Sequence, residues 1–180
     1  MPKAVFLDRD GTIIEDVNYL NHPKDITFIK GSIEAIRKLN QAGYLVIVIT
    51  NQAGIARGYL SEDMLQTIDK VMHKQILNQH AHLDAIYYCP HHPEYGEYPY
   101  KQTCDCRKPE PGMILNAQKH FNIDLKRSFM VGDKDTDIET GQKAGIKTIQ
   151  VLTGKGNELP AEPDHTANDL ADAVNWILSQ

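Results

Sequence analysis

Short apolar stretches recur along the chain and predict five strands. Residues 4–7 run directly into acidic residues, and residues 44–50 form a longer run rich in β-branched side chains. Segments 83–88, 128–132 and 147–151 have the same character. Continuous apolar runs of this length are typical of strands that are buried on both faces, as in a parallel sheet.

Between these segments, apolar residues recur at helical spacing. Positions 33, 36 and 39 predict a helix that begins near Ser32 and ends near Gly43. A longer helix follows Ser61, with acidic residues in its first turn and an apolar stripe from Met64 to Ile76. Residues 113–121 and 170–178 predict two more helices. Because strand, helix and strand alternate, we expect right-handed crossovers and a doubly wound α/β fold, with helices on both faces of a parallel sheet.

The composition narrows the class of protein. The chain has 180 residues, of which 41% are hydrophobic and 24% charged, as in an ordinary globular protein. We expect one domain over residues 1–180, with no separate cap domain because no stretch is long enough to form one. A net charge of -5 argues against a partner such as nucleic acid. No apolar run approaches the length of a membrane span and no signal-peptide pattern is present, so we expect a cytoplasmic protein. We also expect a monomer.

Side chains capable of chemistry follow the predicted strands. Asp8 and Asp10 come after the first strand, Thr50 ends the second, and Asp133 follows the fourth. Open α/β sheets carry their chemistry at the carboxyl ends of the strands. Two close carboxylates repel unless a cation or a shared proton separates them, and Mg²⁺ is the usual cation. The alternative for the first pair is a capping Asp followed by an Asp-Gly turn.

A loop over residues 89–106 carries the most specific local pattern. It contains the three cysteines of the chain, Cys89, Cys104 and Cys106, together with the neighbouring histidines His91 and His92. Three thiolates and one imidazole match a closed tetrahedral zinc site. Four protein ligands leave no position for a substrate, so the zinc should be structural. An odd number of cysteines in one short segment argues against a disulfide framework.

Two further charged segments are candidates for the site, one basic and one acidic. Arg107 and Lys108 follow the metal loop directly, and an Arg fork beside a Lys point charge can bind phosphate. The alternative is a solvated basic pair. Asp135 and Asp137 follow the fourth strand, where they could support the Mg²⁺ site or stabilise the first turn of a helix.

These segments resemble the haloacid-dehalogenase-like phosphatases over residues 4–151. Residues 8–12 are similar to the Asp-x-Asp-Gly-Thr motif of that family, and the remaining motif residues follow in the family's order. The resemblance implies that Asp8 attacks phosphorus and that Asp10 is the general acid and base. It implies that Thr50 and Lys108 bind the phosphoryl oxygens. It also implies that Mg²⁺ is held by Asp8, Asp133 and the main-chain carbonyl of Asp10.

The resemblance also concerns the metal loop and the substrate. It favours His91 over His92 as the zinc ligand, and it implies a small phosphorylated sugar as substrate. The implied substrate contacts are Asp16, Tyr19, Asn51, Gln52, Ala53, Arg107 and Lys134. Histidinol-phosphate phosphatases share the metal loop and all four motifs, and they are the alternative among enzymes. The alternative to an enzyme is a binding module that is held together by zinc and has lost catalysis. The chain nevertheless keeps every catalytic motif residue.

Overall fold

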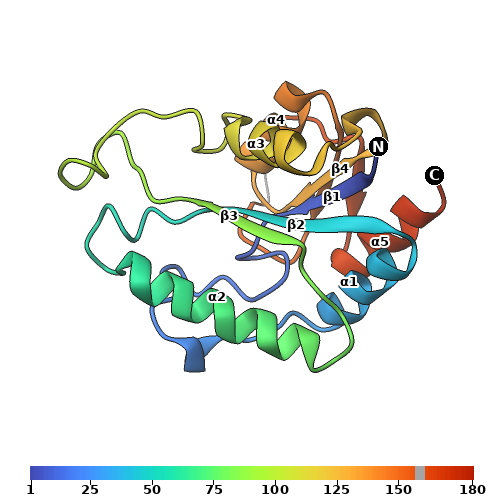
Figure 1. Ribbon diagram of the computed structural model, residues 1–180, viewed down its shortest axis with the longest axis horizontal. Coiled ribbons are helices and arrows are strands. Elements are labelled where there is room, and N and C mark those ends of the chain that lie inside the picture. The colour runs from blue at the N-terminus through green and yellow to red at the C-terminus, as the bar shows by residue number, and fades with distance from the viewer. Residues whose placement is uncertain (157–160) are drawn as a thin grey trace.

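A computed structural model describes residues 1–156 and 161–180. Six parallel strands form one sheet in the order β3-β2-β1-β4-β5-β6 (Figure 1). The strands are β1 Lys3–Leu7, β2 Tyr44–Asn51, β3 Ala85–Cys89, β4 Phe129–Gly132, β5 Lys147–Val151 and β6 His165–Ala167. The five predicted strands are confirmed. Strand β6 was not predicted, because its three residues are too few and too polar to give an apolar run.

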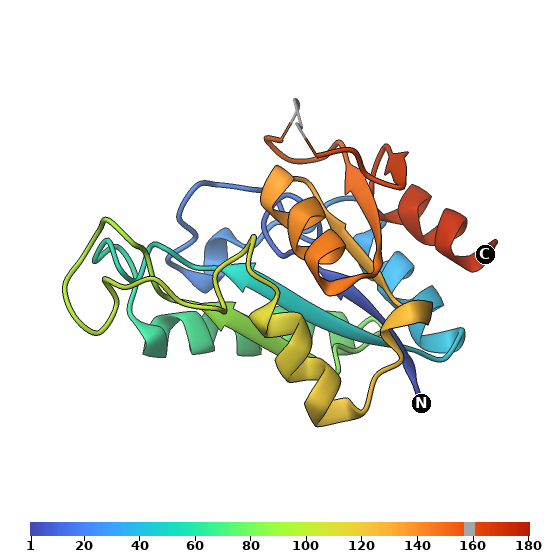
Figure 2. The same cartoon turned by 90° about the horizontal axis from the view of Figure 1, so that it is seen from above.

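The helices cover both faces of the sheet, as predicted. They are α1 Ser32–Gln41, α2 Glu62–Leu77, α3 Gly112–Phe121, α4 Asp135–Ala144 and α5 Leu170–Leu178, with 3-10 turns at Pro23–Asp25 and Leu125–Arg127. Figure 1 shows α3 and α4 on one side of the sheet and α1, α2 and α5 on the other, and Figure 2 shows α3 and α4 from above. The residues that the structure describes include no separate cap domain and no helix long and apolar enough to cross a membrane.

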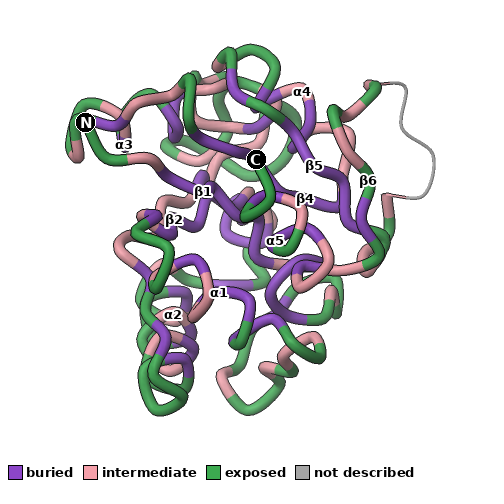
Figure 3. The backbone as a smooth tube through the Cα atoms, turned by 90° about the vertical axis from the view of Figure 1, so that its right-hand side faces the viewer, coloured by how far each residue is buried: buried purple, intermediate pink, exposed green. Residues whose placement is uncertain are grey.

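The alternation of side chains along β1 divides the core into two clusters. Val5 and Leu7 face the cluster beneath α1, α2 and α5, whereas Ala4 and Phe6 face the smaller cluster beneath α3. All four side chains are fully buried. Figure 3 shows that buried segments lie along the central strands and that exposed segments lie on the outer turns. A strand without a solvent-exposed face explains why the sequence of β1 is continuously apolar.

The strand order fixes where polar side chains can meet. The chain runs from β1 to β2 and β3 on one side, then returns to add β4, β5 and β6 on the other side of β1. Leu7 pairs with Val48 of β2 and with Val131 of β4, so these three strands end at one edge. The direction of the strand order changes between β1 and β4, which is where open α/β sheets form a ligand crevice.

Candidate active site

Three carboxylates meet at the carboxyl ends of β1 and β4. Asp8 follows β1 and is fixed by its backbone N–H, which donates to the Val131 carbonyl at 3.0 Å. Asp133 follows β4, and Asp137 lies in the first turn of α4. Each of the three acids offers one carboxylate oxygen, and these oxygens lie within 4.8 Å of one another. The structure thus brings Asp137 into the acidic cluster, while the same residue also caps α4 by accepting from the Lys134 N–H.

Asp133 has the features of a ligand to a divalent cation. It is fully buried, and its Oδ1 has no hydrogen-bond partner among the described residues. Burial raises the pKa of Asp133 to about 7, with the charge of Asp8 adding to the shift. A Cβ on Gly11 would lie 2.8 Å from the Asp133 carboxyl group, and one on Gly154 only 1.9 Å from its Oδ2. This crowded carboxylate beside a second acid fits Mg²⁺, because a hard cation relieves both the repulsion and the missing hydrogen bond.

Lys108 connects the acidic cluster to the loop that follows the metal site. Its Nζ donates to Asp8 Oδ1 at 2.7 Å, to Asp137 Oδ1 at 2.6 Å and to the Ile49 carbonyl at 3.1 Å. Burial by itself would lower the pKa of Lys108, but the two carboxylates outweigh it and raise the pKa, so the side chain stays cationic. The Asn51 side chain holds the Lys108 backbone through two hydrogen bonds of 3.0 Å. The end of β2 therefore positions the ammonium group.

The four expected catalytic side chains surround one small cavity. It has a volume of about 50 Å³ and is lined by Asp8, Asp10, Thr50, Asn51, Lys108, Lys134 and Thr136. The Asp10 carboxylate is not part of the acidic cluster and accepts from Gln52 Nε2 at 3.0 Å. The same Gln52 nitrogen donates to Thr50 Oγ1 at 2.9 Å. The cavity contains a buried ammonium and a hydroxyl group, which suit a tetrahedral anion. It also contains the buried Asp8 carboxylate, whose repulsion of an anion a cation would relieve.

A larger cavity of about 290 Å³ adjoins the small one and shares five of its lining residues. Its lining includes all seven residues expected to contact the substrate: Asp16, Tyr19, Asn51, Gln52, Ala53, Arg107 and Lys134. Lys134 Nζ donates to Asp16 Oδ2 at 3.2 Å across this cavity. Loops that are distant in sequence thus form one continuous space beside the acidic cluster.

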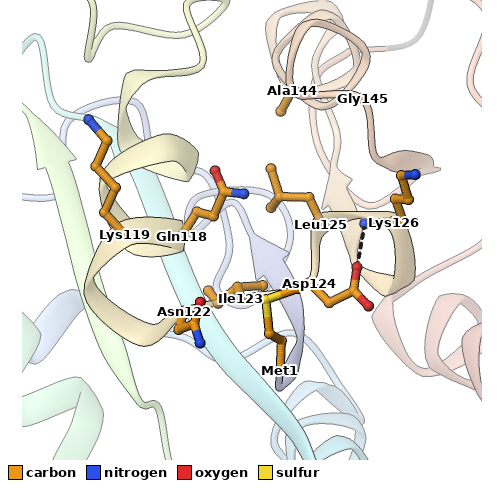
Figure 4. Close-up of a pocket in the computed structure, with 10 residues that line it drawn as sticks. All are labelled: Met1, Gln118, Lys119, Asn122, Ile123, Asp124, Leu125, Lys126, Ala144 and Gly145. Atoms are coloured by element: carbon orange, nitrogen blue, oxygen red, sulfur yellow. Dashed lines mark hydrogen bonds between the residues drawn. The ribbon is translucent and has the colours of Figure 1, made fainter.

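A third, more voluminous cavity lies elsewhere. It has a volume of about 870 Å³, and it is lined by the ends of α3 and α4, by Met1 and by residues 122–126 (Figure 4). None of the expected catalytic or substrate-binding residues lines it. Cavity size is therefore a poor guide to the active site of this protein, where a small polar space adjoins the charged groups.

The metal loop brings together the side chains of Cys89, His91, Cys104 and Cys106. The sulfur–sulfur distances are 3.6 Å between Cys89 and Cys104 and 3.3 Å between Cys104 and Cys106. His91 Nδ1 lies 3.8 Å from Cys89 Sγ and 3.5 Å from Cys106 Sγ. Sulfur atoms about 2.3 Å from a tetrahedral zinc ion would be about 3.8 Å apart, so this cluster has the size of a metal site.

The neighbouring histidine, His92, lies outside this cluster. Its Nδ1 accepts from the Glu94 N–H at 3.1 Å, and its ring lies 4.5 Å from the ring of Tyr95. Arg107 follows the cluster directly, and its Nη1 donates to the His91 carbonyl at 3.1 Å. The geometry therefore separates the two candidate histidines and attaches Arg107 to the metal loop.

Sequence reasoning missed several residues of this site. Thr136 lines both cavities, and the Lys155 N–H donates to Asp133 Oδ2 at 3.0 Å. Arg9 and Asp69 form an ion pair beside Asp10. The only sequence signals for this pair were a cation between two motif acids and an acid bordering the apolar stripe of α2.

Comparison with known proteins is consistent with this geometry. The HAD-hydrolase-like family model matches residues 105–173. A crystal structure of the D,D-heptose 1,7-bisphosphate phosphatase from B. bronchiseptica, complexed with magnesium and phosphate, has a TM-score of 0.88 to this chain. The two chains are 33% identical, and the match covers 98% of each. The fold and the site define a haloacid-dehalogenase-like phosphatase, and the chain belongs to this family of phosphoric monoester hydrolases.

Two relatives of this chain share one particular name. The D-glycero-β-D-manno-heptose-1,7-bisphosphate 7-phosphatase of Pasteurella multocida is 52% identical over 86% of this chain and 84% of its own length. The protein of the same name from Escherichia coli K12 is 43% identical over 98% of this chain and 94% of its own.

Proposed function

We propose that this phosphatase removes the C7 phosphate of D-glycero-β-D-manno-heptose 1,7-bisphosphate with Mg²⁺ as cofactor. The observation that carries the proposal is a phosphoryl-sized cavity at Asp8 that opens into a larger cavity bearing Arg107. The names of the relatives support the heptose as the sugar. They also specify the β anomer, and the sequence alone did not distinguish the two anomers. The product would enter the synthesis of nucleotide-activated heptose for lipopolysaccharide core.

The acidic cluster supports a divalent cation at the reacting phosphate. Asp8 and Asp133 would hold Mg²⁺, with the main-chain carbonyl of Asp10 as a further ligand. When bound, the ion neutralises the repulsion between the Asp8 carboxylate and the phosphate anion. Asp137 lies in the same cluster, but its Oδ1 accepts from Lys108. We therefore assign Asp137 to holding Lys108 and the start of α4.

The side chains around the small cavity support a two-step mechanism. In the first step an Asp8 carboxylate oxygen attacks phosphorus and the bond from phosphorus to the C7 oxygen breaks. Thr50 and Lys108 stabilise the equatorial oxygens, while Asp10 donates a proton to the departing alkoxide. In the second step Asp10 takes a proton from water, whose oxygen attacks phosphorus and releases inorganic phosphate and free Asp8.

We also propose that Zn²⁺ occupies the cysteine and histidine cluster in a structural role. Three sulfur atoms and one nitrogen at tetrahedral separations form a closed ligand set. The substrate would not reach the ion. The ion would instead order the loop that carries Arg107, whose position depends on the His91 carbonyl.

The charge of the larger cavity favours the sugar bisphosphate over histidinol phosphate. Arg107 has no carboxylate within ion-pair distance among the described residues, so its cation is available to a second anion. Burial and the charges of Arg107 and Arg57 lower the pKa of nearby His92, which indicates positive potential beside Arg107. Histidinol phosphate carries an ammonium group, which Arg107 would repel. An inactive binding module would have no use for the retained cluster of catalytic groups.

Asp8→Asn provides the direct test of the mechanism. The variant keeps the shape of Asp8 but removes the nucleophile and one metal ligand, so we expect a folded protein without phosphate release from the bisphosphate. Mass spectrometry of acid-quenched wild-type enzyme should detect a phosphoryl adduct on Asp8. Wild-type rates from Asp8→Asn would refute the covalent mechanism.

A further inference from the structure

Arg9 stands between Asp8 and Asp10 in the sequence, and its side chain is buried. Only 1% of its side chain is exposed. Its Nε donates to Asp10 Oδ2 at 3.1 Å, and its Nη2 donates to Asp10 Oδ1 at 3.2 Å. A guanidinium fork that engages both oxygens fixes the plane of a carboxylate, which the single ammonium of a lysine cannot do.

Asp69 of α2 holds the other end of this arginine. Arg9 Nη1 donates to Asp69 Oδ1 at 3.3 Å, and the Asp69 side chain is 13% exposed. Burial raises the pKa of Asp69 even though the charge of Arg9 opposes the shift. A helix on one face of the sheet therefore contacts the general acid of the proposed mechanism through one arginine.

The two oxygens of Asp10 differ in their surroundings. Oδ2 accepts from Arg9 Nε and from Gln52 Nε2, and Arg9 Nη2 lies 3.0 Å away from it as well. Oδ1 accepts a hydrogen bond only from Arg9 Nη2 among the described residues. Each carboxylate oxygen has two lone pairs in the plane of the group. The two lone pairs of Oδ2 accept hydrogen bonds from Arg9 and Gln52. Oδ1 accepts only one hydrogen bond, so its second lone pair is free to hold the proton.

We propose that Arg9, anchored by Asp69, positions Asp10 so that Oδ1 is the atom that transfers the proton. In the first step the proton passes from Oδ1 to the C7 oxygen as its bond to phosphorus breaks, and in the second step Oδ1 receives a proton from water. Arg9 and Asp69 do not touch the substrate and act through Asp10. The inference rests on the proposed function, because it requires Asp10 to be the general acid.

A purely structural role is the rival explanation for the pair. Buried ion pairs add little stability compared with apolar residues of the same volume, because two charges lose their hydration. Arg9 of this pair also donates hydrogen bonds to Asp10, whose side chain lines both active-site cavities. A positioning role and a structural role predict different dependence on the leaving group, and that dependence is the basis of the test.

The test compares kcat/KM for two substrates in several variants. The sugar bisphosphate loses an alkoxide that needs the Asp10 proton, whereas 4-nitrophenyl phosphate loses a phenolate that needs none. The parameter kcat/KM depends only on the steps up to departure of the leaving group. Hydrolysis of the phosphorylated Asp8, which is the same for both substrates, therefore does not affect it. The variants are Arg9→Lys, Asp69→Asn and Asp10→Ala. The matched control is Arg37→Lys, at a half-buried arginine of α1 that lines neither active-site cavity.

We expect Arg9→Lys to lower kcat/KM for the bisphosphate about ten- to a hundred-fold. This loss is smaller than the full rate acceleration of about 10²–10⁴-fold that a general acid provides, because Asp10 itself remains. The value for the aryl phosphate should fall less than about three-fold, as should both values in Arg37→Lys. Asp69→Asn preserves shape and an acceptor, and it should give the same selective loss at about three- to ten-fold.

Each outcome bears on one of the two claims. An equal loss on both substrates in Arg9→Lys, or no selective loss in Asp69→Asn, would overturn the positioning role while Asp10→Ala still shows its own selective loss. If Asp10→Ala loses activity equally on both substrates, the proposed acid itself is wrong. Should Arg9→Lys fail to fold, as judged by thermal melting, Asp69→Asn decides the question alone.

Discussion

Replacing Arg107 by Ala tests how the enzyme would recognise its substrate. Arg107 lines the larger cavity, and its side chain makes one hydrogen bond to the residues that the structure describes, to the His91 carbonyl. The side chain is half-buried and makes no ion pair among the described residues, so we expect it to bind the 1-phosphate, which is remote from the reacting C7 phosphate. The substitution leaves Lys108 and the acidic cluster in place.

The size of the effect follows from the kind of contact that is lost. A hydrogen bond to a charged group contributes about 1.5–3 kcal/mol. Because about 1.4 kcal/mol corresponds to a factor of ten, we expect kcat/KM for the bisphosphate to fall about ten- to a hundred-fold. Heptose 7-phosphate, which lacks the second phosphate, should lose less than about three-fold.

The assay measures phosphate release from both sugars by wild type, Arg107→Ala and Arg127→Ala. Arg127 is a matched control because it is an exposed arginine in the 3-10 turn Leu125–Arg127, and it lines neither active-site cavity. Equal losses on the two sugars in Arg107→Ala would show that this arginine does not read the second phosphate. The preference for a bisphosphate would then lose its main local support.

Two further predictions concern the metal sites. Cys104→Ser should abolish stoichiometric zinc binding, measured by elemental analysis. The circular dichroism of the sheet should persist, because the buried residues of the larger core cluster all lie outside the loop; His91→Ala should behave likewise. His92→Ala should keep its zinc, and a zinc-free wild type or zinc loss in His92→Ala would contradict the proposed ligand set. For Asp133, the folded-state pKa of about 7 lies above the ordinary 3.8, so the folded protein binds the proton more tightly than the unfolded chain. Without Mg²⁺, this contribution to stability is complete below pH 3.8 and is lost as the pH rises through about 7, so Tm should fall between pH 5 and pH 8. Added Mg²⁺ should raise Tm more at pH 8 than at pH 5, and Asp133→Asn should remove that difference; an Mg²⁺ effect independent of pH in wild type would contradict the assignment of Asp133 as a ligand.

The sequence by itself predicted the class of architecture. Strands buried on both faces need continuous apolar runs, and amphipathic helices need apolar residues at helical spacing, so local pattern predicted five of the six strands and four of the five α-helices that the structure describes, α4 being the exception. Acids and hydroxyl groups directly after such runs predicted the edge of the sheet where chemistry gathers. The apolar pattern did not reveal β6, because a strand of three residues at the edge of the sheet does not need a continuous run of apolar side chains.

The contacts between distant residues required the tertiary structure. Lys108 meets Asp8 across 100 positions and Asp137 across 29, and Arg9 meets Asp69 across 60. Such pairs depend on strand register and on how α2 and α4 pack against the sheet, which no local period encodes. The resemblance to a known family favoured His91 over His92, but only folding shows which ring joins the sulfur atoms. A residue type can suggest chemistry, whereas the identity of its partner is a property of the packed chain.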